Sequence, residues 1–215
     1  MVKNTNWLNH FIEFAVVLSG ILLAFQLDKC SSNRYQKEVV QSHFNEILEE
    51  TRFNKRFLES TIQISKKHLG IIDSTLTLIS DKGDISTINK NALEILNISQ
   101  LYTRKNAFTS FVESGDIRFV KDFYKKRKII DLYEYYKWVE AFDESALRVF
   151  TEDYYPYMRD NFDFKNGSLQ HRDIYFSQTF VNGLAAMRLT SKNKLEKYKD
   201  CLAEVNDFLK DFHEK

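Results

Sequence analysis

The sequence predicts an all-α protein in which an N-terminal transmembrane helix continues into an antiparallel bundle of long helices. One long apolar block occupies residues 7–27, and everything after it is polar or helix-patterned. The chain has one proline and six glycines, with 28% charged residues, a composition that favours long helices over strands. Aromatic residues make up 14% of the chain, which is enough to build a real core.

The apolar block has the length of a membrane helix, because about 20 helical residues cross a hydrocarbon layer of roughly 30 Å. We therefore predict that residues 1–28 form a membrane anchor in the lipid bilayer and residues 29–215 a soluble helical domain. Glu13 lies near the start of the block, where its carboxylate reaches the interface or pairs with another protein. The alternatives are a cleaved signal peptide, lipoprotein processing at Cys30, and a buried helix of a soluble core.

Small residues in the block point to association within the membrane. Ala15 and Ser19 lie four residues apart, as do Gly20 and Ala24, and this spacing lets two helix backbones approach closely. The alternative is that small residues are simply common in membrane helices. The candidate association residues, for a homo-oligomer or for a membrane-protein partner, are Glu13, Ser19, Gly20, Ala24 and Gln26.

The soluble part is expected to be helical throughout. The first helix continues from the apolar block to a turn at residues 81–84, and Ser86 or Thr87 caps the second helix. Apolar residues on almost two faces make the helix over 122–161 the expected central, most covered one, with a kink or an end at Pro156. A Thr190/Ser191 cap is expected to begin the last helix. The predicted helices after the first cover residues 87–98, 106–112, 122–161, 173–189 and 190–213.

Composition and motifs exclude several function classes. A formal net charge of +1 gives no bias toward nucleic acid, so no nucleic-acid partner is expected. Cys30 and Cys201 are too far apart in sequence to suggest a disulfide framework or a metal site, and the histidines are scattered singly. The sequence has no glycine-rich phosphate loop and no nucleophile turn. We therefore predict no catalytic, cofactor-binding or metal-binding residues and no cofactor.

Charged clusters in the soluble part have two interpretations. The run Lys125, Lys126, Arg127 and Lys128 is suited to an anionic surface, such as acidic lipid, or else forms a solvated face. Adjacent carboxylates point in different directions on a helix, so they are expected on solvated faces rather than as paired acids. Such pairs are Glu49 with Glu50, Asp143 with Glu144, and Glu152 with Asp153.

Two stretches resemble a known family. The first comprises Glu13, residues 20–21 and residues 24–27; the second is FTSFVESGD at 108–116, followed by the pairs at 129–130 and 135–136. These residues are similar to an uncharacterised bacterial family, frequent in Bacteroidetes, with one membrane helix and a helical soluble domain. The resemblance implies no activity, cofactor or catalytic residue.

The resemblance also bears on topology. Family members tend to carry a basic segment before the anchor, which implies a cytoplasmic N-terminus and a periplasmic domain on the bacterial inner membrane. Here the only basic residue before the apolar block is Lys3, whereas Lys29, Arg34 and Lys37 follow it. Because basic residues gather on the cytoplasmic side of a membrane, these charges favour a cytoplasmic domain instead. We follow the resemblance and keep the cytoplasmic placement as the alternative.

These observations predict a membrane-anchored, non-enzymatic interaction or accessory protein of the bacterial envelope. One alternative is a ligand-sensing bundle that signals through a partner, because the chain has no recognisable output domain. The other is an enzyme with a site in the aromatic bundle around Tyr133, Tyr136 and His171.

Overall fold

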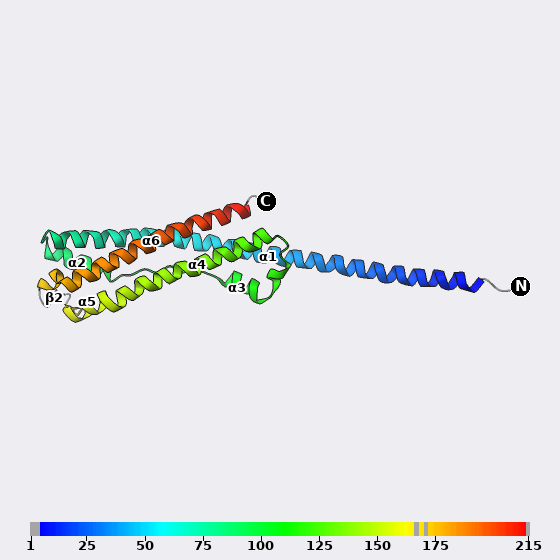
Figure 1. Ribbon diagram of the computed structural model, residues 1–215, viewed down its shortest axis with the longest axis horizontal. Helices are drawn as coiled ribbons and strands as arrows, with labels where there is room; N and C mark the ends of the chain where they lie inside the picture. Colours follow the sequence, from blue (N-terminus) through cyan, green and yellow to red (C-terminus); the bar gives the residue numbers. More distant parts are fainter. Residues whose placement is uncertain (1–4, 166–167, 170–171, 214–215) are drawn as a thin grey trace.

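The computed structural model describes residues 5–165, 168–169 and 172–213, and it confirms the all-α prediction (Figure 1). The short strands β1 (Phe162–Asp163) and β2 (Ser168–Leu169) form an antiparallel pair, and η2 (Phe150–Tyr154) is a π-helical turn. The elements in chain order are α1 (Thr5–Ser80), α2 (Ile85–Ile95), α3 (Asn106–Glu113), η1 (Asp116–Phe119), α4 (Phe123–Val149), η2 (Phe150–Tyr154), α5 (Tyr155–Asn161), β1 (Phe162–Asp163), β2 (Ser168–Leu169), η3 (Arg172–Phe176) and α6 (Gln178–His213).

Helix α1 belongs both to the projecting part of the molecule and to the bundle. It is 76 residues long and passes Gly70 without a break. Its N-terminal part projects alone from one end of the bundle (Figure 1), and α1 first becomes half-buried beyond that part at Asn33. The rest of α1 packs against α6, with Ile47, Leu58 and Ile72 fully buried. One uninterrupted helix therefore joins the apolar residues to the core.

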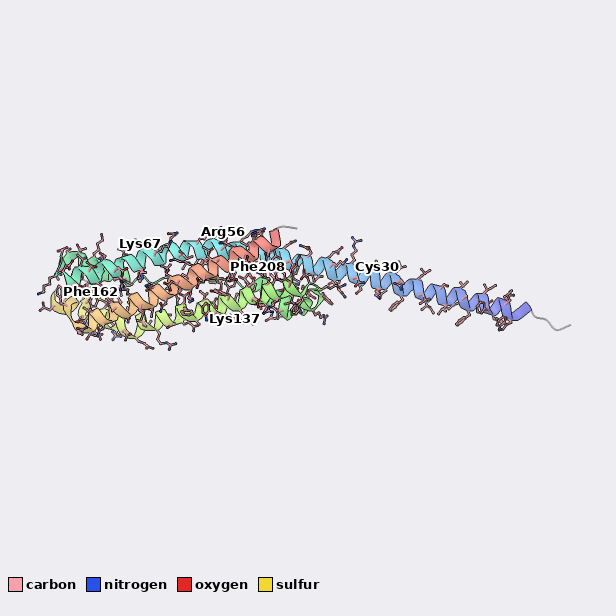
Figure 2. All side chains as sticks on the ribbon, turned by 45° about the horizontal axis from the view of Figure 1, so that its top comes forward. Cys30, Arg56, Lys67, Lys137, Phe162 and Phe208 are labelled. Atoms are coloured by element: carbon pink, nitrogen blue, oxygen red, sulfur yellow. The ribbon has the colours of Figure 1, made fainter. Side chains whose placement is uncertain are left out.

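The three long helices pack side by side. Helices α1 and α4 both run from the projecting end toward the far end, and α6 returns in the opposite direction in contact with both (Figure 1). Figure 2 places Phe208 and Phe162 at opposite ends of the bundle, and these two residues belong to two separate buried clusters. The hydrophobic core is thus divided into two clusters, one toward each end of the bundle.

Helix α6 corrects the predicted cap at Thr190 and Ser191. The predicted helices over 173–189 and 190–213 are one helix from Gln178 onward. The Thr190 hydroxyl donates to the carbonyls of Ala186 and Met187, four and three residues earlier, and Ser191 is buried. A hydroxyl bonded back to its own helix fits a helix interior, so these residues do not start a new element.

The start of α2 also differs from the prediction. Asp84, rather than Ser86 or Thr87, is the N-cap, and its carboxylate accepts a 2.8 Å hydrogen bond from the Thr87 amide. Aspartate is among the strongest N-caps because its carboxylate also interacts favourably with the helix dipole. Helix α2 ends at Ile95, three residues before its predicted end.

The aromatic helix is less covered than predicted. Tyr133 and Tyr136 are buried on its inner face, but Phe123 and Trp138 are exposed on its outer face. Only one face of α4 therefore belongs to the core. Its junction with α5 is helical through Pro156, and the amide of Tyr155 bonds to the carbonyl of Phe150, five residues earlier. This π turn makes room where proline supplies no amide hydrogen.

Residues 96–105, here called the crossing segment, lie between α2 and α3 and form no helix beyond the turn that ends α2. The segment runs back along the bundle from the far end toward the projecting end (Figure 1). Leu101 is buried in the cluster that also contains Tyr133 and Tyr198. Where such a non-helical backbone is covered, as at Leu101, its amides and carbonyls have no helical partners, so other groups must supply them.

Candidate functional site

Residues 7–27, here called the apolar segment, have their side chains exposed, with Ala15 half-buried. Among the described residues, one helix is long and apolar enough to cross a membrane, and this segment supplies its apolar window, with a mean hydropathy of 1.8 and no residue buried in the bundle. Signal sequences share these properties. The N-terminal residues before Thr5, including Lys3, lie outside the described residues.

The candidate association residues lie along the apolar segment. Ser19 and Gly20 line a shallow groove with Ala15, and a Cβ added at Gly20 would meet no atom within 4 Å. Ala24 and Gln26 are exposed one to two turns further on. Glu13 lies 3.4 Å from the Nδ1 atom of His10 on the same helix. These residues are therefore accessible to another helix.

The basic run does not act as one unit. Lys128 forms salt bridges to Asp207 at 2.6 Å and to Asp211 at 3.2 Å, both on α6, and the hydrogen bond to Asp207 is the main cause that raises the pKa of Lys128. Arg127 lies 3.5 Å from Asp131 on its own helix. Lys128 thus ties α4 to α6, whereas Lys125 and Lys126, both half-buried, form no salt bridge in the part of the chain that the structure describes.

Asp143 on α4 holds the middle of the crossing segment. Its carboxylate accepts a 2.8 Å hydrogen bond from the Leu101 amide and another from the Tyr198 hydroxyl on α6. Lys194 lies 3.5 Å from the same carboxylate and donates to the Ser99 carbonyl at 2.8 Å. Asp143, Lys194 and Tyr198 are at most 5% exposed. Burial lowers the pKa of Lys194, and the nearby carboxylate opposes that shift.

A second group, on α1, holds the C-terminal end of the crossing segment and the start of α3. The Asn54 side chain accepts from the Arg104 amide at 2.8 Å and donates to the Arg104 carbonyl at 2.9 Å. The Glu50 carboxylate accepts from the Ala107 amide at 2.9 Å and from the Tyr133 hydroxyl. Burial and this carboxylate both raise the pKa of Tyr133. Buried polar side chains from α1, α4 and α6 therefore supply the bonds that the non-helical backbone lacks.

These positions correct the prediction of solvated carboxylate pairs. Glu50 and Asp143 are buried, at 8% and 5% exposure, while their neighbours Glu49 and Glu144 are exposed. Glu152 and Asp153 are exposed as predicted. A lone buried carboxylate is costly, but each of these has hydrogen-bond donors that offset the loss of water.

The two tyrosines of α4 that the sequence singled out differ in their hydroxyl groups. That of Tyr133 donates to Glu50, whereas that of Tyr136 is buried without a hydrogen-bond partner among the described residues. We expect Tyr133→Phe to lower the free energy of unfolding by about 1–3 kcal/mol, because it leaves the Glu50 carboxylate short of a donor. Tyr136→Phe removes no bond and should change it by less than about 0.5 kcal/mol. Urea titrations of both variants in detergent test this, and equal losses would contradict it.

The described residues show no group of catalytic or metal-binding side chains around Tyr133 and Tyr136. His171 lies outside the described residues, so it is not placed relative to Tyr133 and Tyr136. Within the described ranges no three histidine, cysteine or carboxylate side chains gather as a metal site would require. Cys30 is exposed on α1 and Cys201 is buried in α6. No family model, curated protein or solved structure matches this chain.

Proposed function

We propose that the protein is a membrane-anchored, non-enzymatic interaction or accessory protein of the bacterial envelope. The observation that supports this most is the continuity of α1, which joins an exposed apolar segment to a buried bundle face without a break. A helix that long is stiff, so the bundle is held at a fixed distance and orientation from the bilayer. The resemblance to a single-span bacterial family supports the inner membrane, with the bundle in the periplasm and the cytoplasm as the alternative.

The first test is purification of the full-length protein in mild detergent, with mass spectrometry of whatever accompanies it. The proposal expects a stoichiometric membrane-protein partner or a second copy of this chain. Recovery of a monomer alone, across several mild detergents, would count against it. Extraction of membranes with alkaline carbonate tests the anchor separately, because a spanning helix stays in the pellet.

A substitution in the apolar segment tests how association occurs. Gly20→Leu adds a bulky side chain where the groove is open, so it should keep two helix backbones apart. We expect association measured by crosslinking in detergent to weaken by about 1 kcal/mol or more, that is at least fivefold. Leu22→Ile, on an exposed position outside the groove, is the control. Unchanged association would remove Gly20 from the interface.

One observation favours ligand sensing as a second candidate. A cleft of about 680 Å³ opens beside Glu50 and Arg104. A ligand bound there would touch both α1 and the crossing segment, so it could shift their packing and pass the change along α1. A screen of small polar metabolites by thermal shift would support this function if a hit were lost on substitution of Arg56, which also lines the cleft.

A further inference from the structure

A second cleft lies at the projecting end of the bundle, between α1 and the chain that leads from η1 into α4. We call it the stalk cleft; its volume is about 470 Å³. Three lysines line it: Lys37 from α1, and Lys121 and Lys125 from the other side. Its apolar lining includes Val40, Phe44 and Val120. A lining with three lysines suits a ligand that carries an anionic group.

The charges of the stalk cleft are largely uncompensated. Within the described part of the chain, Lys37, Lys121 and Lys125 form no salt bridge, unlike their neighbours Arg127 and Lys128. Asp122 is the one acidic residue in the lining, and its carboxylate accepts the 3.1 Å hydrogen bond from the Lys125 amide that caps α4. Three cations against one anion leave an excess of positive charge that faces solvent.

The stalk cleft begins on α1 close to the lipid headgroups and extends away from the bilayer. Its nearest residue on α1, Asn33, lies six positions beyond Leu27, which is about 9 Å along a helix. Headgroups occupy roughly 5–8 Å on each side of the hydrocarbon layer. Lys37 lies ten positions beyond Leu27, about 15 Å along a helix, and its long stem reaches back toward the headgroups. Phe123, next to the cleft, is 75% exposed.

We infer that the stalk cleft binds the headgroup of an anionic phospholipid from the leaflet next to the bundle. The phosphate lies among the three lysines, with Lys37 on α1 and Lys121 and Lys125 on the opposite side. The inference rests on the proposed insertion of α1, which is what brings this end of the bundle to the headgroups. The proposed site therefore consists of Lys37, Lys121 and Lys125 rather than of the contiguous run at 125–128. Lys128 is left out because it forms salt bridges to α6.

The test measures lipid preference on the full-length protein. Native mass spectrometry in detergent compares retention of phosphatidylglycerol and phosphatidylcholine with identical acyl chains. Each lysine near an anionic surface contributes about a fivefold preference, so K37Q/K121Q/K125Q should lower the phosphatidylglycerol preference at least about tenfold. The matched control K66Q/K90Q/K192Q removes three exposed lysines elsewhere and should leave the preference unchanged.

Each other outcome overturns the inference. Equal retention of the two lipids by the wild type, or an equal loss in both triple variants, means that the stalk cleft is not a selective headgroup site. Displacement of the lipid by an acidic peptide at equal concentration would assign the cleft to an acidic protein instead. Release of the wild type by alkaline carbonate would reject the anchor, and with it the adjacent leaflet as the source of the lipid. The preference for phosphatidylglycerol in detergent tests the cleft separately, because it is measured independently of insertion.

Discussion

Replacing Asp143 by alanine is expected to lower the free energy of unfolding by about 3–5 kcal/mol, the usual cost of breaking a buried ion pair from one side. The substitution leaves the Leu101 amide, the Tyr198 hydroxyl and the Lys194 ammonium without the carboxylate that now accepts from them or faces them. Since small domains are stable by only 5–15 kcal/mol in general, this loss should unfold much of the bundle at moderate temperature. Urea denaturation of the full-length protein in detergent, followed by circular dichroism, measures it.

Two variants identify the cause of that loss. Glu144→Ala removes the exposed neighbouring carboxylate and should change the free energy of unfolding by less than about 0.5 kcal/mol. Lys194→Met removes the buried ammonium, so the double variant with Asp143→Ala should be less unstable than the sum of the single variants by about 1 kcal/mol or more. If Asp143→Ala behaves like Glu144→Ala, Asp143 does not hold the crossing segment.

The parts of the fold that depend on local pattern could be predicted. The turn at residues 81–84 ends α1 as expected, and α3 begins at Asn106 as expected and ends one residue past its predicted end. Gly115 has a φ of 76°, the left-handed conformation that a glycine just after a helix commonly adopts. Each of these features is set by residues within a few positions of one another, which is the range over which helix periodicity and capping act.

The crossing segment and its supports could not be predicted in the same way. The carboxylate of Asp143 is useful inside the core only because the Leu101 amide, 42 positions earlier, needs an acceptor. No local pattern reports such a pairing. A weaker signal was present, because Asp143 follows Tyr136 and Val139 at helical spacing and precedes Ala146 on the same buried face. A charged residue on an otherwise buried stripe indicates a polar partner inside the core.

The basic run at 125–128 also could not be interpreted from the sequence alone, because its contacts involve residues far away in the chain. The run at 125–128 is contiguous in sequence, yet Lys128 is joined to Asp207, 79 positions later, and Lys125 lies beside Lys37 and Lys121 in the stalk cleft. Neighbours on a helix point in different directions, so a charge run read from the sequence overstates the charge on any one face. The cationic set that faces the proposed headgroup region required the packing of α1 against η1, from which the chain leads into α4.

Raising the pH above about 10 is expected to unfold the bundle steeply. Tyr133, Tyr136, Tyr154, Tyr175 and Tyr198 are all at most 1% exposed. Burial is the largest cause that raises the pKa of each of them above the ordinary value of 10. The folded state therefore keeps these protons after the unfolded chain has lost them, so their stabilisation is complete below about pH 10 and declines above it.

The size of the effect follows from the number of tyrosines. Each buried tyrosine lowers the free energy of unfolding by about 1.4 kcal/mol per pH unit above the pKa of the unfolded chain. Five tyrosines together lower it by at most about 7 kcal/mol per pH unit. The Cys201 thiol, whose pKa burial raises to about 12, adds a loss of the same sign. Burial lowers the pKa of Lys194, so that group alone gains stability as the pH rises toward its unfolded value near 10.4. One opposing group cannot offset six.

The transition can be followed by tyrosine absorbance at 295 nm and circular dichroism at 222 nm on the full-length protein in detergent between pH 7 and pH 12.5. A steep rise in tyrosinate should coincide with a loss of helicity that stops short of zero, because the apolar segment stays helical in the micelle. Tyr136→Phe removes one buried ionisable hydroxyl that has no hydrogen-bond partner among the residues that the structure describes, so it should lower the slope by about 1.4 kcal/mol per pH unit and move the midpoint upward. Gradual ionisation of every tyrosine with helicity intact would contradict the burial of these side chains, since a folded bundle of this kind cannot hold five phenolates in its core.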